Sequence, residues 1–224
     1  MSINLGLYDF FSFLIPGLLY MFAFGKLLVD LGWNYSEAIP WETVDFSNII
    51  IILPVVAFAY IVGHVMDVVA NGVFVRAIRR MRNRSNKTVS AEVKALAIQK
   101  EVHPNLDIKF SEKDWFLLFN LIGQRNITLS QYIDKYQADS IMLRNISFGS
   151  FLLAIFQVVG DVGSSASSSL AIVFLSLVFS IVTYLKSEDF RMWFFSSIFE
   201  ASLEYGLSLE EVVKYNHMKH ENKN

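Results

Sequence analysis

The sequence contains no cysteine among its 224 residues. This absence excludes disulfide bonds, thiolate-bound metal clusters and cysteine nucleophiles. A chain without thiols is compatible with any redox compartment, so the absence does not place the protein in the cell.

Common catalytic patterns are also missing. The sequence has no G-x-S-x-G, no Walker A loop and no glycine-rich dinucleotide turn. His217 and His220 form an H-x-x-H that lacks the acidic partner supplied by H-E-x-x-H. We therefore expect a protein that is not an enzyme, with no metal site and no cofactor.

Lys and Arg are scarce outside one stretch of the chain. Thirteen of the nineteen basic residues lie between Arg76 and Arg144, and none lies in 34–48 or 160–169. Basic segments resist translocation and stay in the cytoplasm. We therefore predict that the stretch 76–144 is cytoplasmic, that the two short connections face outward and that both termini are inside.

Apolar residues are abundant. Hydrophobic residues make up 54% of the chain, twenty residues are Phe, and only 18% are charged, which is unusual for a soluble protein. Four apolar runs are long enough, or nearly so, to cross a bilayer as helices; they cover 10–31, 48–69, 146–162 and 170–185. The N-terminal run has no preceding basic residue and no cleavage site after it, so it predicts an uncleaved anchor.

These patterns predict an all-α protein, a four-helix transmembrane bundle with a small helical cytoplasmic module, in a bacterial inner membrane. Its parts are a first transmembrane pair (1–75), a cytoplasmic insert (76–144), a second pair (145–186) and C-terminal helices (187–224). The second span has no stop signal at its inner end, so we expect its helix to continue into the cytoplasm.

Within the insert, Ser90 precedes one predicted helix and Gly123 is a candidate C-cap of the next. A further helix opens at Thr128 or Ser130 and is expected to run into the third span.

A separate amphipathic helix is predicted directly after the fourth span. Its apolar face, which contains Trp193, Phe194 and Ile198, would either lie in the membrane interface or dock on the helix around Trp115. We favour docking, because an insert of this size alone would struggle to build a core.

Ionisable residues inside a span are candidate functional residues, because each costs about 2.5–3.5 kcal/mol at the helix centre. His64 and Asp67 lie at i and i+3 on the second span, and Asp9 lies at similar depth on the first. Such a pair would relay protons, sense pH, or hold two helices together through hydrogen bonds. Lys26 and Asp30 form a second pair near the opposite leaflet, where the simpler interpretation is a lysine paired with its helix neighbour.

A basic stripe follows the second span. Arg76, Arg80 and Arg84 repeat at i, i+4, with Arg79 beside them. We interpret the stripe as a contact with anionic lipid headgroups. Nucleic-acid binding is the alternative, and the position against the bilayer leaves little room for a duplex.

Three pairs of small residues at i, i+4 would allow close helix approach in a bundle or an oligomer; they are Ala59 with Gly63, Ser150 with Ala154, and Ser176 with Ser180.

The run YDFFSFLIPGLLY, a second span containing AYIVGHVMDVV, and MLRNISFG before the third span resemble bacterial four-span membrane proteins of anti-phage defence systems. The transmembrane subunit of Kiwa and the four-span effectors of cyclic-nucleotide systems have this layout. The resemblance implies no role for any single residue. It implies an oligomeric membrane sensor or membrane-perturbing effector with a soluble cytoplasmic partner. An oligomeric ion channel or small transporter is the alternative.

Overall fold

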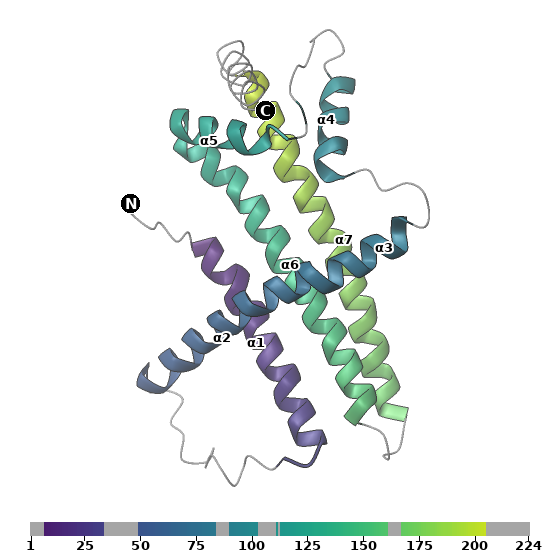
Figure 1. Cartoon of the computed structure of the whole chain (residues 1–224). Helices are drawn as coiled ribbons and strands as arrows, with labels where there is room; N and C mark the ends of the chain where they lie inside the picture. Colours follow the sequence, from purple (N-terminus) through teal and green to yellow (C-terminus); the bar gives the residue numbers. More distant parts are fainter. Residues whose placement is uncertain are drawn as a thin grey trace, which may run out of the picture. The chain divides into compact units, whose positions relative to one another are not determined.

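A computed structural model of the chain describes residues 7–33, 49–83, 90–102, 111, 113–160 and 167–204. All regular structure in these ranges is helical (Figure 1). The elements are α1 (Leu7–Asp30), α2 (Ile49–Val69), the π-helical turn η2 (Ala70–Phe74), α3 (Val75–Asn83), α4 (Ala91–Val102), α5 (Trp115–Arg125), α6 (Ile127–Gly160) and α7 (Ser167–Glu204). The predicted all-α class is confirmed.

Four of the described helical segments are long and apolar enough to cross a membrane. They are Phe10–Asp30, Ile52–Ile78, Ile127–Gly160 and Leu170–Leu203. By helix length and composition, the chain is a multi-pass membrane protein. The last two helices extend beyond the predicted spans.

One element boundary differs from the prediction. The fourth span and the helix expected after it are a single helix, α7. The sequence between Ser167 and Glu204 contains no glycine or proline that would end it. The change from apolar to charged residues near Lys186 therefore does not end the helix.

The chain divides into two compact units. Unit 1 comprises 1–84 and 141–187, and unit 2 comprises 85–140 and 188–224. Each unit has a hydrophobic core of its own, and each is described separately below.

In unit 1, α2 crosses α1 with the two backbones in direct contact (Figure 1). A Cβ atom on Gly17 would overlap the carbonyl oxygen of Ala59, and one on Gly63 would overlap the carbonyl oxygen of Phe13. Only glycine allows this approach. The predicted pairing of Ala59 with Gly63 is therefore used inside the chain, between its first two helices.

The helices α2, η2 and α3 follow one another without a break, which confirms that the second span continues as a helix. The continuation packs on α6 and α7: the Phe74 ring lies 5.3 Å from that of Phe148 and 6.0 Å from that of Tyr184, between centroids. The core of unit 1 is completed by Tyr20, Ala70 and Val75.

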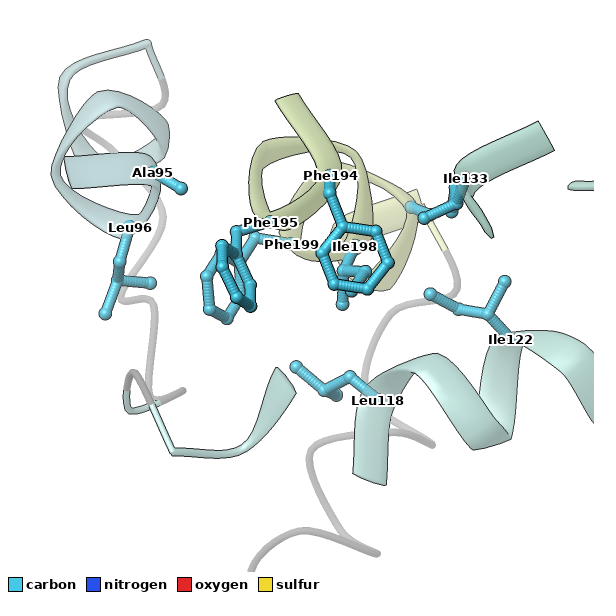
Figure 2. Packing of buried hydrophobic residues seen from close by; sticks show 10 residues of the cluster. Ala95, Leu96, Leu118, Ile122, Ile133, Phe194, Phe195, Ile198 and Phe199 are labelled. Carbon is cyan, nitrogen blue, oxygen red and sulfur yellow. The ribbon is translucent and has the colours of Figure 1, made fainter. Parts of the chain in front are cut away.

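The core of unit 2 is formed by α4, α5 and the parts of α6 and α7 that belong to this unit. Figure 2 shows Phe194 and Ile198 of α7 facing Leu118 and Ile122 of α5, with Ile133 of α6 beside them. The remaining members are Ala95, Leu96, Phe195, Phe199 and Ala201.

The predicted docking of this face on the Trp115 helix is thus confirmed. The Trp115 ring lies 5.9 Å from Phe194 and 5.4 Å from Phe195, both edge to face.

An ion pair joins α4 to α7 at the edge of this core. Arg191 Nη2 donates a hydrogen bond to Glu92 Oε1 at 2.9 Å. Burial alone would raise the pKa of the Glu92 carboxyl. The hydrogen bond from its own backbone N–H and the Arg191 guanidinium outweigh burial, and they hold this pKa below its ordinary value of 4.5.

At the starts of α4 and α6, a side chain accepts a hydrogen bond from a backbone N–H group of the first turn. The Val93 N–H donates to Ser90 Oγ at 3.3 Å, which confirms Ser90 as the cap of α4. Two predicted boundaries were wrong. Gly123 lies inside α5, and α6 begins before Thr128, because extended Asn126 ends α5 and its side chain accepts the Leu129 N–H at 3.0 Å.

Some predicted features lie outside the described residues. They are the connection 34–48, residues 161–166 of the second connection, Arg84, and the segment that contains His217 and His220.

Candidate functional site

An ion pair links two helices of unit 1. Arg144 Nη2 of α6 donates to Asp67 Oδ1 of α2 at 2.6 Å. The side chains are 16% and 23% exposed, respectively. A charge that is largely removed from water is stable only with a partner, so this contact holds α2 against α6.

Tyr20 of α1 joins the same region. Its hydroxyl donates to the backbone carbonyl of Asn145 at 2.8 Å, 125 positions along the chain. The Tyr20 side chain is fully buried and its ring packs edge to face on Phe148, with 6.1 Å between centroids. The helices α1, α2 and α6 therefore meet at one polar cluster, which we define as Tyr20, Asp67, Arg144 and Asn145.

The Asn145 amide is the chemically unusual member of the polar cluster. The residue is completely buried. Among the described residues, neither its Nδ2 nor its Oδ1 has a hydrogen-bond partner, and the same holds for Arg144 Nε. A buried polar atom left unpaired costs about 1–3 kcal/mol. The cluster therefore retains free donors and an acceptor next to a charge pair.

A second polar contact joins α6 to α7. Ser147 Oγ donates to the Ser180 carbonyl at 2.7 Å, and Ser180 Oγ donates to the Ser147 carbonyl at 2.8 Å. Each serine thus bonds the backbone of the other helix, and both side chains are buried. Small hydroxyl residues allow close approach in apolar surroundings, so this reciprocal pair holds the two helices together.

His64 lies apart from Asp67. Its ring is exposed and stacks on Phe13 at 3.7 Å, and it meets Tyr60 edge to face at 4.6 Å, between centroids. Among the described residues, the Asp67 carboxylate pairs with Arg144 rather than with His64. The i, i+3 spacing brings the two side chains to one side of α2, but the glycine crossing places His64 beside α1 and leaves Asp67 facing α6.

Lys26 and Asp30 form the pair that their spacing suggests, at 2.5 Å within α1. Asp30 also lies against Gly160 of α6, where a Cβ atom would come 2.6 Å from the Asp30 Cβ and Oδ2. Since this pair and the polar cluster lie at different positions along α1, the structure does not bring the two predicted pairs together.

The other predicted residues are less fully described. Asp9 lies in the first turn of α1, and Arg76, Arg79 and Arg80 lie on α3. Arg76 and Arg80 are exposed, as contact with a headgroup or any other outside partner requires.

No group of three metal-ligating side chains converges within the part of the chain that the structure describes. Comparisons with protein-family models, with curated proteins and with solved structures found no match to this chain. The polar cluster must therefore be interpreted from its geometry alone.

Sequence reasoning identified Asp67 but missed Tyr20, Arg144 and Asn145. A usable signal existed for Arg144: it is the basic residue that directly precedes the third apolar run, and Asp67 lies near the same end of the second. Tyr20 and Asn145 carry no such signal, because one is an ordinary aromatic residue in a span and the other lies at the start of an apolar run.

Proposed function

We propose that this protein is a non-enzymatic integral component of a bacterial inner membrane that acts in a defence or stress response. It works as an oligomeric sensor or membrane-perturbing effector. The observation that carries the proposal is the division of the chain into two units, one built around apolar helices and one with a separate core. The second unit offers a folded surface to a soluble partner, and the first offers helices that respond within the membrane.

The layout resemblance supports the choice of anti-phage defence among membrane responses. The charge distribution supports a cytoplasmic unit 2, with both termini inside. Exposed Arg76 and Arg80 on α3 support a contact with anionic lipid headgroups. Nucleic acid is not part of the proposal.

The test is a phage challenge of the native strain. The gene is deleted and then restored with either the wild type or a variant carrying Asp67→Leu, and plating efficiency is measured over a phage panel. We expect the deletion to raise plating for some phages and only the wild type to reverse this. Unchanged plating of every phage, in a strain that expresses the protein, would contradict the defence role.

The second candidate function is an oligomeric ion channel or small transporter. It is favoured by one observation, the charge pair of Asp67 and Arg144 beside the Asn145 amide, which has no partner in the described part of the chain. Ionisable groups inside spans often mark ion paths. Ion flux through liposomes that contain the purified protein, lost in Asp67→Asn and kept in Asp30→Asn, would favour the channel over the first proposal.

A further inference from the structure

Unit 1 contains a cavity of about 570 Å³ between α1 and α2. Its lining is entirely apolar: Met21, Phe24, Gly25 and Leu28 from α1, and Phe58, Ile61, Val62, Val65 and Met66 from α2. The volume lies within the range of about 300–1,000 Å³ that is typical of ligand sites.

The cavity follows from the way the two helices meet. Gly17 and Gly63 bring the backbones into contact at one point. Two straight helices that touch at a single crossing diverge beyond it, so side chains further along cannot reach the facing helix. On α1 the lining runs from Met21 to Leu28, beyond Gly17, and on α2 it runs from Phe58 to Met66, on either side of the crossing at Ala59 and Gly63.

The lining selects the chemistry of the occupant. It contains no charged side chain and no side-chain hydrogen-bond donor or acceptor other than thioether sulfur, so water gains nothing there. Phe58, Ile61 and Val65 are 57%, 57% and 58% exposed, so the cavity opens on the outer surface of α2. Both helices are apolar enough to span a membrane, and inside a bilayer the medium at that surface would be hydrocarbon.

A second copy of the chain is a poorer occupant. Close helix approach in membranes relies on small residues. Gly17, Ala59 and Gly63 are already used in the crossing, and Ser150, Ala154 and Ser180 are buried inside unit 1. The lining itself contributes one small residue, Gly25, among eight large ones. The cavity has instead two methionines, whose flexible side chains adapt to a flexible ligand.

We propose that this cavity binds one acyl chain of a membrane phospholipid. The chain fills the space between α1 and α2 and contacts Phe24 and Phe58. This inference goes beyond the proposed function and needs only the membrane location. It would stand even if the protein had no part in defence.

The test uses full-length protein in nanodiscs of phosphatidylethanolamine and phosphatidylglycerol. A phospholipid with a photoreactive diazirine in one acyl chain is added, and the labelled residues are mapped by mass spectrometry. We expect labels to concentrate on cavity residues such as Phe24 and Phe58. Phe174 and Phe179, which are 67% and 53% exposed on α7, should carry several-fold less label. Even labelling of all exposed apolar residues would show annular lipid only and would overturn the proposal.

A matched pair of variants tests the site itself. Val65→Trp fills the cavity, whereas Val68→Trp adds the same side chain to the next turn of α2, at a residue that is 72% exposed and outside the lining. We expect Val65→Trp to reduce labelling of Phe24 several-fold and Val68→Trp to leave it unchanged. Equal labelling in both variants would contradict the proposal, provided that circular dichroism shows both folded.

Occupation of the cavity by a second copy of the chain can be tested separately by disulfide formation. Because the sequence has no cysteine, a Val65→Cys variant carries a single thiol, at the cavity. Efficient disulfide formation between copies in the nanodisc would place a second chain at the cavity and overturn the lipid assignment. The lipid assignment requires that the Val65→Cys variant stays monomeric and that its cavity residues are photolabelled as strongly as in the wild type.

Discussion

The contact between Asp67 and Arg144 shows how strongly one side chain can depend on another in apolar surroundings. Removing one partner leaves a charge without compensation, which costs about 3–5 kcal/mol in a fully buried pair. These side chains keep some exposure, so we expect Asp67→Leu or Arg144→Leu to lower the free energy of unfolding by roughly 1–3 kcal/mol.

The measurement is a double-mutant cycle on detergent-solubilised protein, unfolded with denaturant. The double variant Asp67→Leu, Arg144→Leu should lose less free energy of unfolding than the two single variants lose together, because neither charge is left without its partner. Lys26→Met, which breaks the local pair on α1, is the comparison, because its effect on the free energy of unfolding should add to those of the Asp67 and Arg144 substitutions. Strict additivity of the two leucine substitutions would show that the pair contributes no coupling.

The glycines at the crossing of α1 and α2 also affect stability as single residues. Gly17→Ala adds a methyl group that overlaps the Ala59 carbonyl, so the helices must move apart. We expect a loss of about 1–3 kcal/mol in the free energy of unfolding. Thermal unfolding followed by circular dichroism provides the measurement.

Gly72→Ala is the matched control, because nothing lies within 4 Å of a Cβ placed there. In a helix interior, this substitution should be neutral or should stabilise by about 0.5–1 kcal/mol. Equal losses from both glycines would mean that the crossing is not held as closely as described.

Between elements, the reciprocal serine contact joins α6 to α7. Ser147→Ala or Ser180→Ala removes one hydrogen bond to the backbone of the other helix. We expect each to cost about 0.6 kcal/mol, the average for hydrogen bonds inside membranes. The two substitutions should be non-additive in a double-mutant cycle, because each hydroxyl depends on the position of the other helix.

Ser150→Ala is the comparison for this contact. Its hydroxyl bonds the Ile146 carbonyl of its own helix at 2.9 Å, so its loss should not couple to Ser180. Coupling of Ser150 with Ser180 as large as that of Ser147 would argue against a specific contact between the helices.

The ion pair between α4 and α7 gives unit 2 a pH dependence. The pKa of Glu92 is lowered in the folded state, so its ionised form contributes stability above its ordinary value of 4.5. That contribution should fall as the pH drops through the lower, folded-state pKa. In Glu92→Gln, the difference in unfolding free energy from the wild type should therefore shrink as the pH is lowered below 4.5.

Denaturant unfolding at a series of pH values from neutral to acidic measures this effect. Glu101→Gln, at an exposed position on the same helix, is the control. A Glu92→Gln difference that stayed constant over the whole series would contradict the linkage.

Local patterns predicted the elements better than the contacts between them. Hydropathy and capping residues act over a few positions, so the spans and the start of α4 at Ser90 could be predicted from the sequence. The contact of Asp67 with Arg144 joins residues 77 positions apart. It depends on which face α2 turns towards α6, and that face is fixed by the crossing at Gly17 and Gly63. No pattern along one helix contains this information.

For the whole molecule, the main expectation is sidedness. Basic residues concentrate between Arg76 and Arg144, so we expect this stretch to face the cytoplasm. A Phe110→Cys variant should resist an impermeant maleimide in intact cells with a permeabilised outer membrane, whereas Tyr35→Cys should react. Rapid labelling of Phe110→Cys under these conditions would reverse the predicted orientation. Labelling of both variants after cell lysis is the control.

Because helical structure is unbroken from Ile49 to Asn83, α2, η2 and α3 behave as one continuous rod. Any rotation of α2 about its axis turns Arg76 and Arg80 with it. A π-helical turn accommodates one extra residue, which corresponds to about 100° of rotation in an α-helix. The turn Ala70–Phe74 therefore sets the direction in which the arginines point relative to Asp67. Loss or gain of this single turn would redirect the basic stripe without changing its sequence.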